Sequence, residues 1–583
     1  MRLRDQIVSF VCIILSAVLL IGAGIQLDGI NQKRQEMNLV SNVPLENAPP
    51  ALAFATVALG AFRGLVVDIL WMRADTLKEQ GLFFDAKQLA EWITTLQPRF
   101  GSVWEFQAWN MSYNISVAIP STQPEQRWHW VKSGYDLLRD KGIPQNPKNM
   151  LLYRELARIF SHKIGSVSDD AHKYYKIQLA AEMSPLLGAD GLKSDSHEYF
   201  ETLVKAPKQW RQIESDPNIT PLLTSLKNAD KAFTNATGDE FVKSYLTLRQ
   251  NPSKFDNKAF EVIDNFRGTK TLRDFDLFAK SWQLRNTWKL EPELMDYLNK
   301  TYGPLDLSKD DPNAHLPLDW RHPSAQALYW AVKGLQTASK EKILVTEINA
   351  DRTVNHSLQS LFREGKMYIY DVPKEEVKTV AYDPEEATGK RIYLRPDIRM
   401  FMVYNKAAMA NIKKYTDYES QSTFESMQIG HRNMLENAAL LFYQSGHKKQ
   451  AEKIYKELQK LYPRPDFDVP FVEFIRNRFK KELESLHIYD AQEQVTALLR
   501  DSYFLYALRD DDESFGRENL AREVYDFYQK SYKTENRIEL PPISFCRYFA
   551  LRDFLYDDQF PLSLRQRLLN RIAIERPDVY IQL

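Results

Sequence analysis

Residues 432–463 read RNMLENAALLFYQSGHKKQAEKIYKELQKLYP, and this stretch decides the expected fold. A small residue is followed by an aromatic, then a glycine, a second small residue, a second aromatic and a proline. The small residues let two antiparallel helices approach closely, and the aromatics fill the space between them. The glycine permits a tight turn, and the proline stops the second helix. The residues that define this pattern are Ala439, Phe442, Gly446, Ala451, Tyr455 and Pro463.

The same frame occurs nearer the start of the chain. It is carried there by Ala74, Leu77, Gly81, Ala86, Ala90 and Pro98. Trp104 and Ala108 begin a further helix, and a looser helix pair is expected within residues 150–188. At these three places the chain resembles tetratricopeptide-repeat proteins. The resemblance implies a helical solenoid with a protein-binding role and brings no catalytic residues, although any packed helical bundle can show similar spacing.

An uninterrupted apolar run precedes this helical body at residues 7–27. About twenty helical residues span roughly 30 Å of hydrocarbon. We therefore expect a transmembrane anchor at 7–27, with a cytoplasmic start at 1–6 and a linker at 28–50. A cleaved signal sequence and a buried core helix are the alternatives. An anchor of this kind predicts a single-pass membrane protein whose bulk is extracytoplasmic, in the periplasm, and whose membrane contact is made by residues 7–27.

A second apolar stretch, residues 51–72, contains Arg63 and Asp68. Each of these charges costs about 2.5–3.5 kcal/mol at a bilayer centre, so this stretch is not expected to span. It predicts an amphipathic helix that opens the folded body. The alternative is a helix that contacts a membrane or a membrane partner.

The pattern divides the rest of the chain into four regions, so the expected fold is mainly α. Residues 51–188 form an N-terminal repeat-like region, and 189–320 an irregular helical middle region. Residues 321–415 combine helices with a small β-hairpin insertion, because the periodicity changes to short strands between Met367 and Leu394. Residues 416–583 form a C-terminal repeat-like region.

Composition and motifs exclude several classes of function. Lys+Arg and Asp+Glu balance at 77 each, so no nucleic-acid partner is expected. Cys12 and Cys546 lie near opposite ends of the chain, which argues against a disulfide framework. No phosphate loop, dinucleotide fingerprint, metalloprotease motif or nucleophile elbow occurs, so no catalytic residue, cofactor or metal is predicted. The acidic run Asp510 to Glu513 indicates a solvated turn, and His315 and His322 flank Asp319 in a structured loop.

The candidate partner groove comprises Trp104, Trp109, Asn110 and Asn114. The two asparagines lie one helical turn apart. Because a buried asparagine must be hydrogen-bonded, they either bind a crossing backbone within the fold or hold a peptide in the groove. Aromatic side chains supply anchors at binding surfaces, but the default role of such residues is core packing.

Three hypotheses for function follow. The leading one is a membrane-anchored helical-repeat scaffold or adaptor that binds a protein partner without turnover. The alternative is an extracytoplasmic enzyme, or a carbohydrate- or cell-envelope-binding protein, with a cleft in residues 310–400 formed by acids and aromatics. The second alternative is an accessory subunit of a transporter or secretion complex that contacts a membrane subunit through the helix at 51–72.

Overall fold

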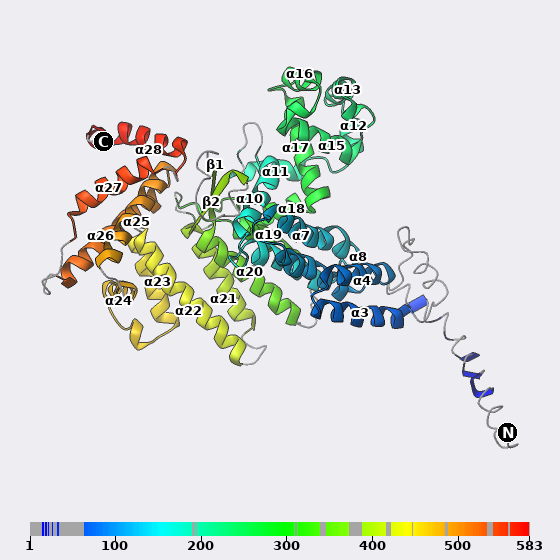
Figure 1. Cartoon of the computed structure of the whole chain (residues 1–583), viewed down its shortest axis with the longest axis horizontal. Helices are drawn as coiled ribbons and strands as arrows, with labels where there is room; N and C mark the ends of the chain where they lie inside the picture. The colour runs from blue at the N-terminus through cyan, green and yellow to red at the C-terminus, as the bar shows by residue number, and fades with distance from the viewer. Residues whose placement is uncertain are drawn as a thin grey trace.

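The computed structural model describes the chain from residue 63 onward with gaps, and only scattered positions between 14 and 33 before it (Figure 1). The ranges described are 63–188, 195–307, 313–337, 345–371, 388–415, 421–445, 447–483, 488–532, 540–557 and 560–581, with the single residues 193, 309 and 311. This part of the chain is mainly helical, as predicted, and its one sheet has two strands.

The structure corrects the predicted membrane anchor. No helix in the described part of the chain is long and apolar enough to cross a membrane. An apolar run makes a span only where the same residues form one continuous helix, and most of residues 7–27 lie outside the described residues. The prediction of a single-pass anchor was therefore wrong, and the periplasmic localisation inferred from it loses its basis. The second stretch, 51–72, enters the described residues only at Arg63, where α3 begins.

The N-terminal helices begin with an antiparallel hairpin of α3 (Arg63–Glu79) and α4 (Phe83–Leu96). Ala74 and Ala86 are fully buried where the two helices pack together. Gly81 lies in the turn with φ +77°, a left-handed conformation that a side chain disfavours. The elements that follow are α5 (Gly101–Trp109), η2 (Asn110–Ile115), α6 (Ser116–Ala118), α7 (Pro124–Leu137), η3 (Leu138–Gly142), α8 (Ile143–Gln145), α9 (Met150–Arg158), η4 (Ile159–Ile164), α10 (His172–Met183) and η5 (Ser184–Leu186).

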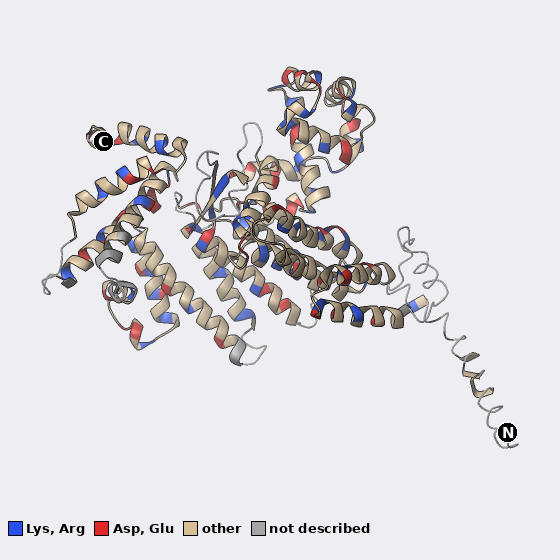
Figure 2. Cartoon of the chain, viewed as in Figure 1, with Lys and Arg blue, Asp and Glu red and all other residues tan. Residues whose placement is uncertain are grey.

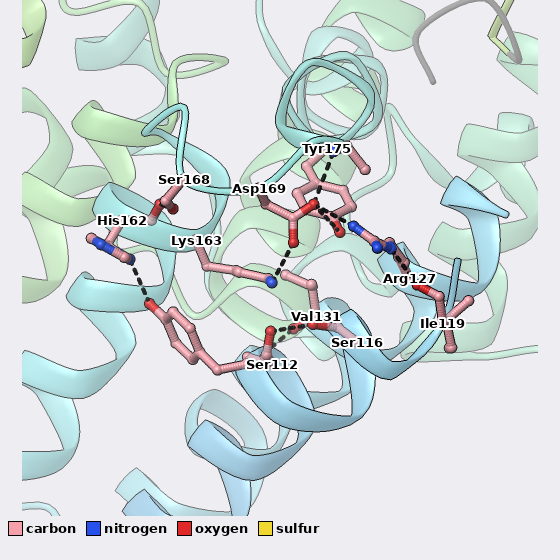
Figure 3. Close-up of polar contacts among 12 residues, drawn as sticks. Ser112, Ser116, Ile119, Arg127, Val131, His162, Lys163, Ser168, Asp169 and Tyr175 are labelled. Carbon is pink, nitrogen blue, oxygen red and sulfur yellow. Dashed lines mark hydrogen bonds and ion pairs between the residues drawn. The ribbon is translucent and has the colours of Figure 1, made fainter. Parts of the chain in front are cut away.

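A buried ion-pair network joins α7, η4 and the loop before α10 (Figure 3). The carboxylate of Asp169 accepts hydrogen bonds from Arg127 Nη1 at 3.0 Å, from Lys163 Nζ at 2.5 Å and from the Tyr175 hydroxyl at 3.2 Å. The backbone N–H of Ala171 donates a fourth bond to it at 2.8 Å. Burial alone would raise the pKa of Asp169, but the two cations and the backbone donor lower it below its ordinary value. The network therefore holds one ionised carboxylate between two buried cations.

The middle region, where the sequence predicted an irregular helical arrangement, forms a series of short helices. Most of them project as a lobe above the rest of the molecule (Figure 1). The lobe packs around aromatic side chains, including Phe233, Phe241, Tyr245 and Phe275, all fully buried. The helices of this region are α11 (His197–Lys205), α12 (Trp210–Glu214), α13 (Thr220–Ala229), α14 (Lys231–Thr234), α15 (Gly238–Gln250), η6 (Pro252–Lys254), α16 (Asn257–Asn265), α17 (Lys270–Gln283), η7 (Leu284–Trp288) and α18 (Pro292–Tyr302).

Helix α19 (Pro323–Leu335) is the central element of the core. Every residue from Pro323 to Ala331 is buried, and the helix packs against α9, α18 and α20 (Val345–Glu364). A Cβ on Gly334 would lie 2.8 Å from the Cβ of Tyr153, so a glycine here allows α9 to approach closely. Strands β1 (Lys366–Asp371) and β2 (Lys390–Arg395) then form an antiparallel hairpin at the expected place. The third expected strand, at 377–382, lies outside the described residues.

The C-terminal helices extend away from the hairpin to the end of the chain (Figure 1). Helices α22 and α23 form the hairpin expected at 432–463, with Ala439, Phe442, Ala451 and Tyr455 buried. Gly446 lies outside the described residues, and Pro463 follows the end of α23. The elements are η10 (Ile398–Met400), α21 (Phe401–Tyr415), α22 (Gln421–Gln444), α23 (Lys448–Leu461), η11 (Pro465–Phe467), α24 (Phe471–Leu483), α25 (Ile488–Ala507), α26 (Asp511–Tyr532), α27 (Ile543–Tyr556), α28 (Leu562–Glu575) and α29 (Pro577–Tyr580).

Two glycine-to-alanine changes are expected to have opposite effects on stability. Gly81→Ala places a side chain at positive φ and should destabilise the fold by about 1 kcal/mol. Gly430 lies within α22, and a Cβ there meets no atom within 4 Å. Gly430→Ala should therefore stabilise by about 0.5–1 kcal/mol. Urea unfolding midpoints measure both changes, and equal signs would contradict the turn conformation at Gly81.

Loss of the buried carboxylate is expected to be costly. Asp169→Asn leaves Lys163 and Arg127 without a counter-charge, which should destabilise the fold by about 3–5 kcal/mol. Asp170 is exposed, so Asp170→Asn is the matched control and should change stability by less than about 0.5 kcal/mol. Chemical denaturation of the two variants tests the difference; similar midpoints would show that the network contributes little.

Candidate functional site

A cleft of about 890 Å³ lies where the helical body meets the C-terminal helices. Four segments that are distant in the sequence line it. They are the loop before α19 (316–321), the start of β1 (365–368), the turn before α21 (397–400) and the turn after α25 (508–510). Lys193 and Asp195 add charged side chains that are exposed to solvent. The cleft therefore depends on the docking of the C-terminal helices onto the body.

The β-hairpin forms one wall of this cleft and connects the two parts of the molecule. Met367 lies on the face that packs against Ile177 of α10. Because side chains alternate along a strand, Lys366 and Tyr368 lie on the opposite face. Lys366 Nζ donates to both oxygens of Asp510, at 3.0 and 2.7 Å, and the Tyr368 hydroxyl donates at 2.7 Å. Burial raises the pKa of Tyr368, so this hydroxyl remains a donor.

A second ion pair reinforces this connection at the end of the hairpin. Arg395 of β2 donates through Nη2 to Asp501 of α25 at 2.6 Å. Arg395 pairs with Lys366 across the two strands, so both cations lie on the same face of the hairpin. The apolar face is thus packed on the body, and the polar face is ion-paired to α25 and the turn that follows it.

Two turns of the same design carry arginines into the cleft lining. Arg321 donates from Nε and Nη2 to the two carboxylate oxygens of Asp319, at 2.9 and 2.7 Å. Arg399 makes the same pair of bonds to Asp397, both at 2.8 Å. In each turn the backbone N–H of the arginine also donates to the same aspartate. Each guanidinium is therefore fixed by a carboxylate two residues earlier.

The third arginine in the lining, Arg509, adopts an unusual backbone conformation. Its φ is +63°. In the described part of the chain, Lys289 is the other non-glycine residue with a positive φ. Arg509 follows α25, and the next N–H, that of Asp510, donates to the carbonyl of Leu505. This is a helix end at which glycine is strongly preferred.

The loop that carries Arg321 is held by hydrogen bonds to α18 and by the cap of α19. Asn299 of α18 accepts hydrogen bonds through Oδ1 from the N–H of Leu318 and from the indole of Trp320, both at 3.0 Å. His322 caps α19 by accepting the Ser324 N–H at Nδ1, so its Nε2 carries the proton and donates to the Glu364 carbonyl. Burial lowers the pKa of His322 to about 4, which keeps the imidazole neutral.

A smaller side pocket of about 180 Å³ adjoins the cleft and shares Leu316, Lys366 and Arg399 with it. Glu513 lines this pocket and is buried, and its burial raises the pKa of the carboxyl. The acidic run that begins at Asp510 was predicted to be a solvated turn. That interpretation was wrong for Asp510, which binds the hairpin, and for Glu513.

The structure separates the residues of the predicted partner groove from this cleft. Trp104 is buried, and its indole donates to the Pro98 carbonyl at 2.7 Å. Asn110 is fully buried; its amide donates to the Phe83 carbonyl at 3.1 Å and accepts from Asn114 at 2.8 Å. Trp109 is half-buried and stacks on Tyr113. These contacts are with the protein's own backbone and side chains, and the partner groove stays a prediction.

The lining residues that the sequence did not single out are Arg321, Lys366, Arg399 and Arg509. The sequence predicted a structured loop at 313–323, in which Asp319 stands between His315 and His322, and it gave no role to Arg321. One signal was available: Asp319-Trp320-Arg321 and Asp397-Ile398-Arg399 each have an aspartate and an arginine at the same spacing just before a helical segment.

No protein-family model matches the chain, and no curated protein matches its sequence. The resemblance to tetratricopeptide-repeat proteins therefore stays a prediction. Among the described residues no group of three or more histidine, cysteine or acidic side chains is placed to hold a metal ion. Figure 2 shows basic and acidic residues interspersed along the helices of each region.

Stability is expected to fall between pH 6.5 and pH 4. The pKa of His322 is about 4 in the folded protein and ordinarily 6.5, so the unfolded chain binds the proton more tightly. The neutral imidazole contributes its full stabilisation above pH 6.5. By pH 5, protonation of the unfolded chain has lowered the free energy of unfolding by about 2 kcal/mol. Burial also lowers the pKa of His431 to about 4, so it adds a similar loss.

The histidine variants separate these contributions. His322→Gln and His431→Gln should each reduce the pH dependence of the free energy of unfolding, measured by denaturant titration from about pH 7.5 to pH 5. The imidazole of His356 lies outside both networks and His356→Gln is the control. An unchanged pH dependence in both buried-histidine variants would contradict the assignment of neutral, buried imidazoles.

Proposed function

We propose that this chain is a helical scaffold that binds a segment of a partner protein in the cleft and acts without chemical turnover. The observation that carries this proposal is the cleft of about 890 Å³ at the junction of the body and the C-terminal helices. Ligand sites occur preferentially at such junctions, and this volume lies in the range of known binding sites. Arg321, Lys366 and Arg399 of the lining are already held in place by ion pairs, which reduces the entropy lost when a ligand binds.

The chemistry of the lining favours binding over catalysis. An acid–base catalyst needs a group that exchanges a proton with its substrate. Asp319, Asp397 and Asp510 each accept hydrogen bonds from a neighbouring cation. His322 is neutral and has both ring nitrogens hydrogen-bonded to backbone groups. These groups hold neighbouring side chains and backbone in place, and their hydrogen bonds leave them poorly suited to proton transfer.

Exposed aromatic side chains on α27 support a protein partner. Phe545, Tyr548, Phe549 and Tyr556 lie along one helix and are all exposed. Aromatic residues dominate the energetics of protein interfaces, so these side chains offer a second contact surface for a protein partner.

A small polar ligand in the same cleft is the second candidate function. Part of the cleft lining comes from the region 310–400, where the sequence predicted an enzymatic or carbohydrate-binding cleft, and this part includes Asp319, Trp320 and Tyr368. Acids and aromatics together are typical of sugar-binding sites, although Trp320 is 1% exposed and its ring is largely packed in the core.

Peptide display against the full-length chain tests the proposed function. We expect enriched peptides to bind the wild-type protein and to lose binding to Leu316→Trp, because the indole occupies cleft space next to β1. Ile574→Trp is the matched control, since Ile574 is 80% exposed on α28 and should leave binding unchanged. Thermal unfolding confirms that both variants are folded. The proposal would be overturned if the enriched peptides bind Leu316→Trp as tightly as the wild type, or if the selection enriches no peptide.

A further inference from the structure

The cleft lining has an excess of positive charge. Five basic side chains line it against four acidic ones, and each acid of the inner lining is paired with a cation of its own. The basic residues are Lys193, Arg321, Lys366, Arg399 and Arg509, and the acidic residues are Asp195, Asp319, Asp397 and Asp510. The uncompensated charge therefore favours an anionic ligand.

Arg321 and Arg399 keep hydrogen-bond donors for such a ligand. Each uses Nε and Nη2 on its own aspartate, and neither Nη1 has a hydrogen-bond partner among the described residues. An arginine held by a bidentate carboxylate has lost its side-chain freedom during folding, so less entropy is lost when it binds an oxyanion. The side chains are each 35% exposed, which leaves them accessible from the cleft.

Arg509 adds a cation whose backbone is strained. A positive φ costs a non-glycine residue roughly 1 kcal/mol. The charge of Arg509 helps to lower the pKa of Glu575 on α28, and in the described part of the chain its guanidinium makes neither an ion pair within 4 Å nor a hydrogen bond. Strained residues cluster at ligand-binding sites, and Arg509 lies in the lining of the cleft.

We propose that the cleft recognises an acidic, extended peptide segment whose carboxylates are bound by Arg321, Arg399 and Arg509. This inference rests on the proposed function and names its ligand. The three arginines come from three separate segments, so a ligand with several carboxylates engages them better than a single anion. Apolar lining residues such as Leu318 and Met400 contact the aliphatic parts of such a segment.

Fluorescence anisotropy with a labelled hexaglutamate peptide tests the inference, with hexaglutamine as the uncharged probe. We expect saturable binding of hexaglutamate to the full-length chain at about 0.15 M salt and no comparable binding of hexaglutamine. Arg509→Gly should weaken hexaglutamate binding roughly tenfold, which is the loss of one charge-assisted contact. The same change should raise the unfolding midpoint, because glycine relieves the backbone strain.

Lys289→Gly is the matched control. Lys289 has φ +54° and lies outside the cleft, so its replacement relieves the same kind of strain and removes one positive charge. It should leave hexaglutamate binding unchanged. Arg321→Lys and Arg399→Lys retain the charge but lose the guanidinium fork, and both should weaken binding.

The outcomes distinguish this inference from the proposed function. If Arg509→Gly binds hexaglutamate as tightly as the wild type, or if hexaglutamine binds equally well, the acidic-segment inference is overturned. If display peptides require an open cleft but carry no acidic residues, the inference fails and the proposed function stands. If pyrophosphate binds in the cleft and no peptide does, the ligand is a small oxyanion, and both proposals are overturned.

Discussion

The complete burial of α19 is the constraint on which the rest of the structure depends. Every residue from Pro323 to Ala331 is buried, so this stretch of the helix has neighbours on all sides and no face toward solvent. Helices α9, α18 and α20 cover it, so the N-terminal, middle and central parts of the chain share one core. The N-terminus of this helix also fixes the cleft, because its N-cap residue, His322, directly follows Arg321 in the cleft lining.

The hairpin extends this constraint to the C-terminal helices. Its two faces have different chemistry, apolar toward α10 and ionic toward α25. One face is held by the burial of apolar side chains. The other face is held by the directional, charge-assisted hydrogen bonds of Lys366 and Arg395. A cleft lined by charged groups is left where the two parts meet, since ionic contacts are satisfied in pairs and do not fill space as apolar side chains do.

The sequence predicted the local structure better than the site. Helix hairpins at 70–98 and 432–463 follow from spacing between near neighbours, and the structure buries the small residues Ala74, Ala86, Ala439 and Ala451 as expected. The strand pair was also visible, because a change of period is a local signal. The predicted membrane anchor was wrong, because no helix in the described residues is long and apolar enough to cross a membrane.

The cleft was not predictable in detail, because its partners are far apart in the chain. Asp510 meets Lys366 across 144 residues, and no local pattern records that contact. Its acidic neighbours suggested a solvated turn for the same reason. The strain at Arg509 is likewise invisible in the sequence, since only the backbone conformation shows that an arginine occupies a position that favours glycine.

Hydrogen–deuterium exchange of the full-length chain with and without hexaglutamate tests the central claim most directly. We expect slower exchange confined to the backbone of residues 316–321, 397–400 and 508–510, with the distant α12 and α13 of the lobe unchanged. Protection at another surface, or no protection at saturating peptide, would contradict a binding site at the junction of the body and the C-terminal helices.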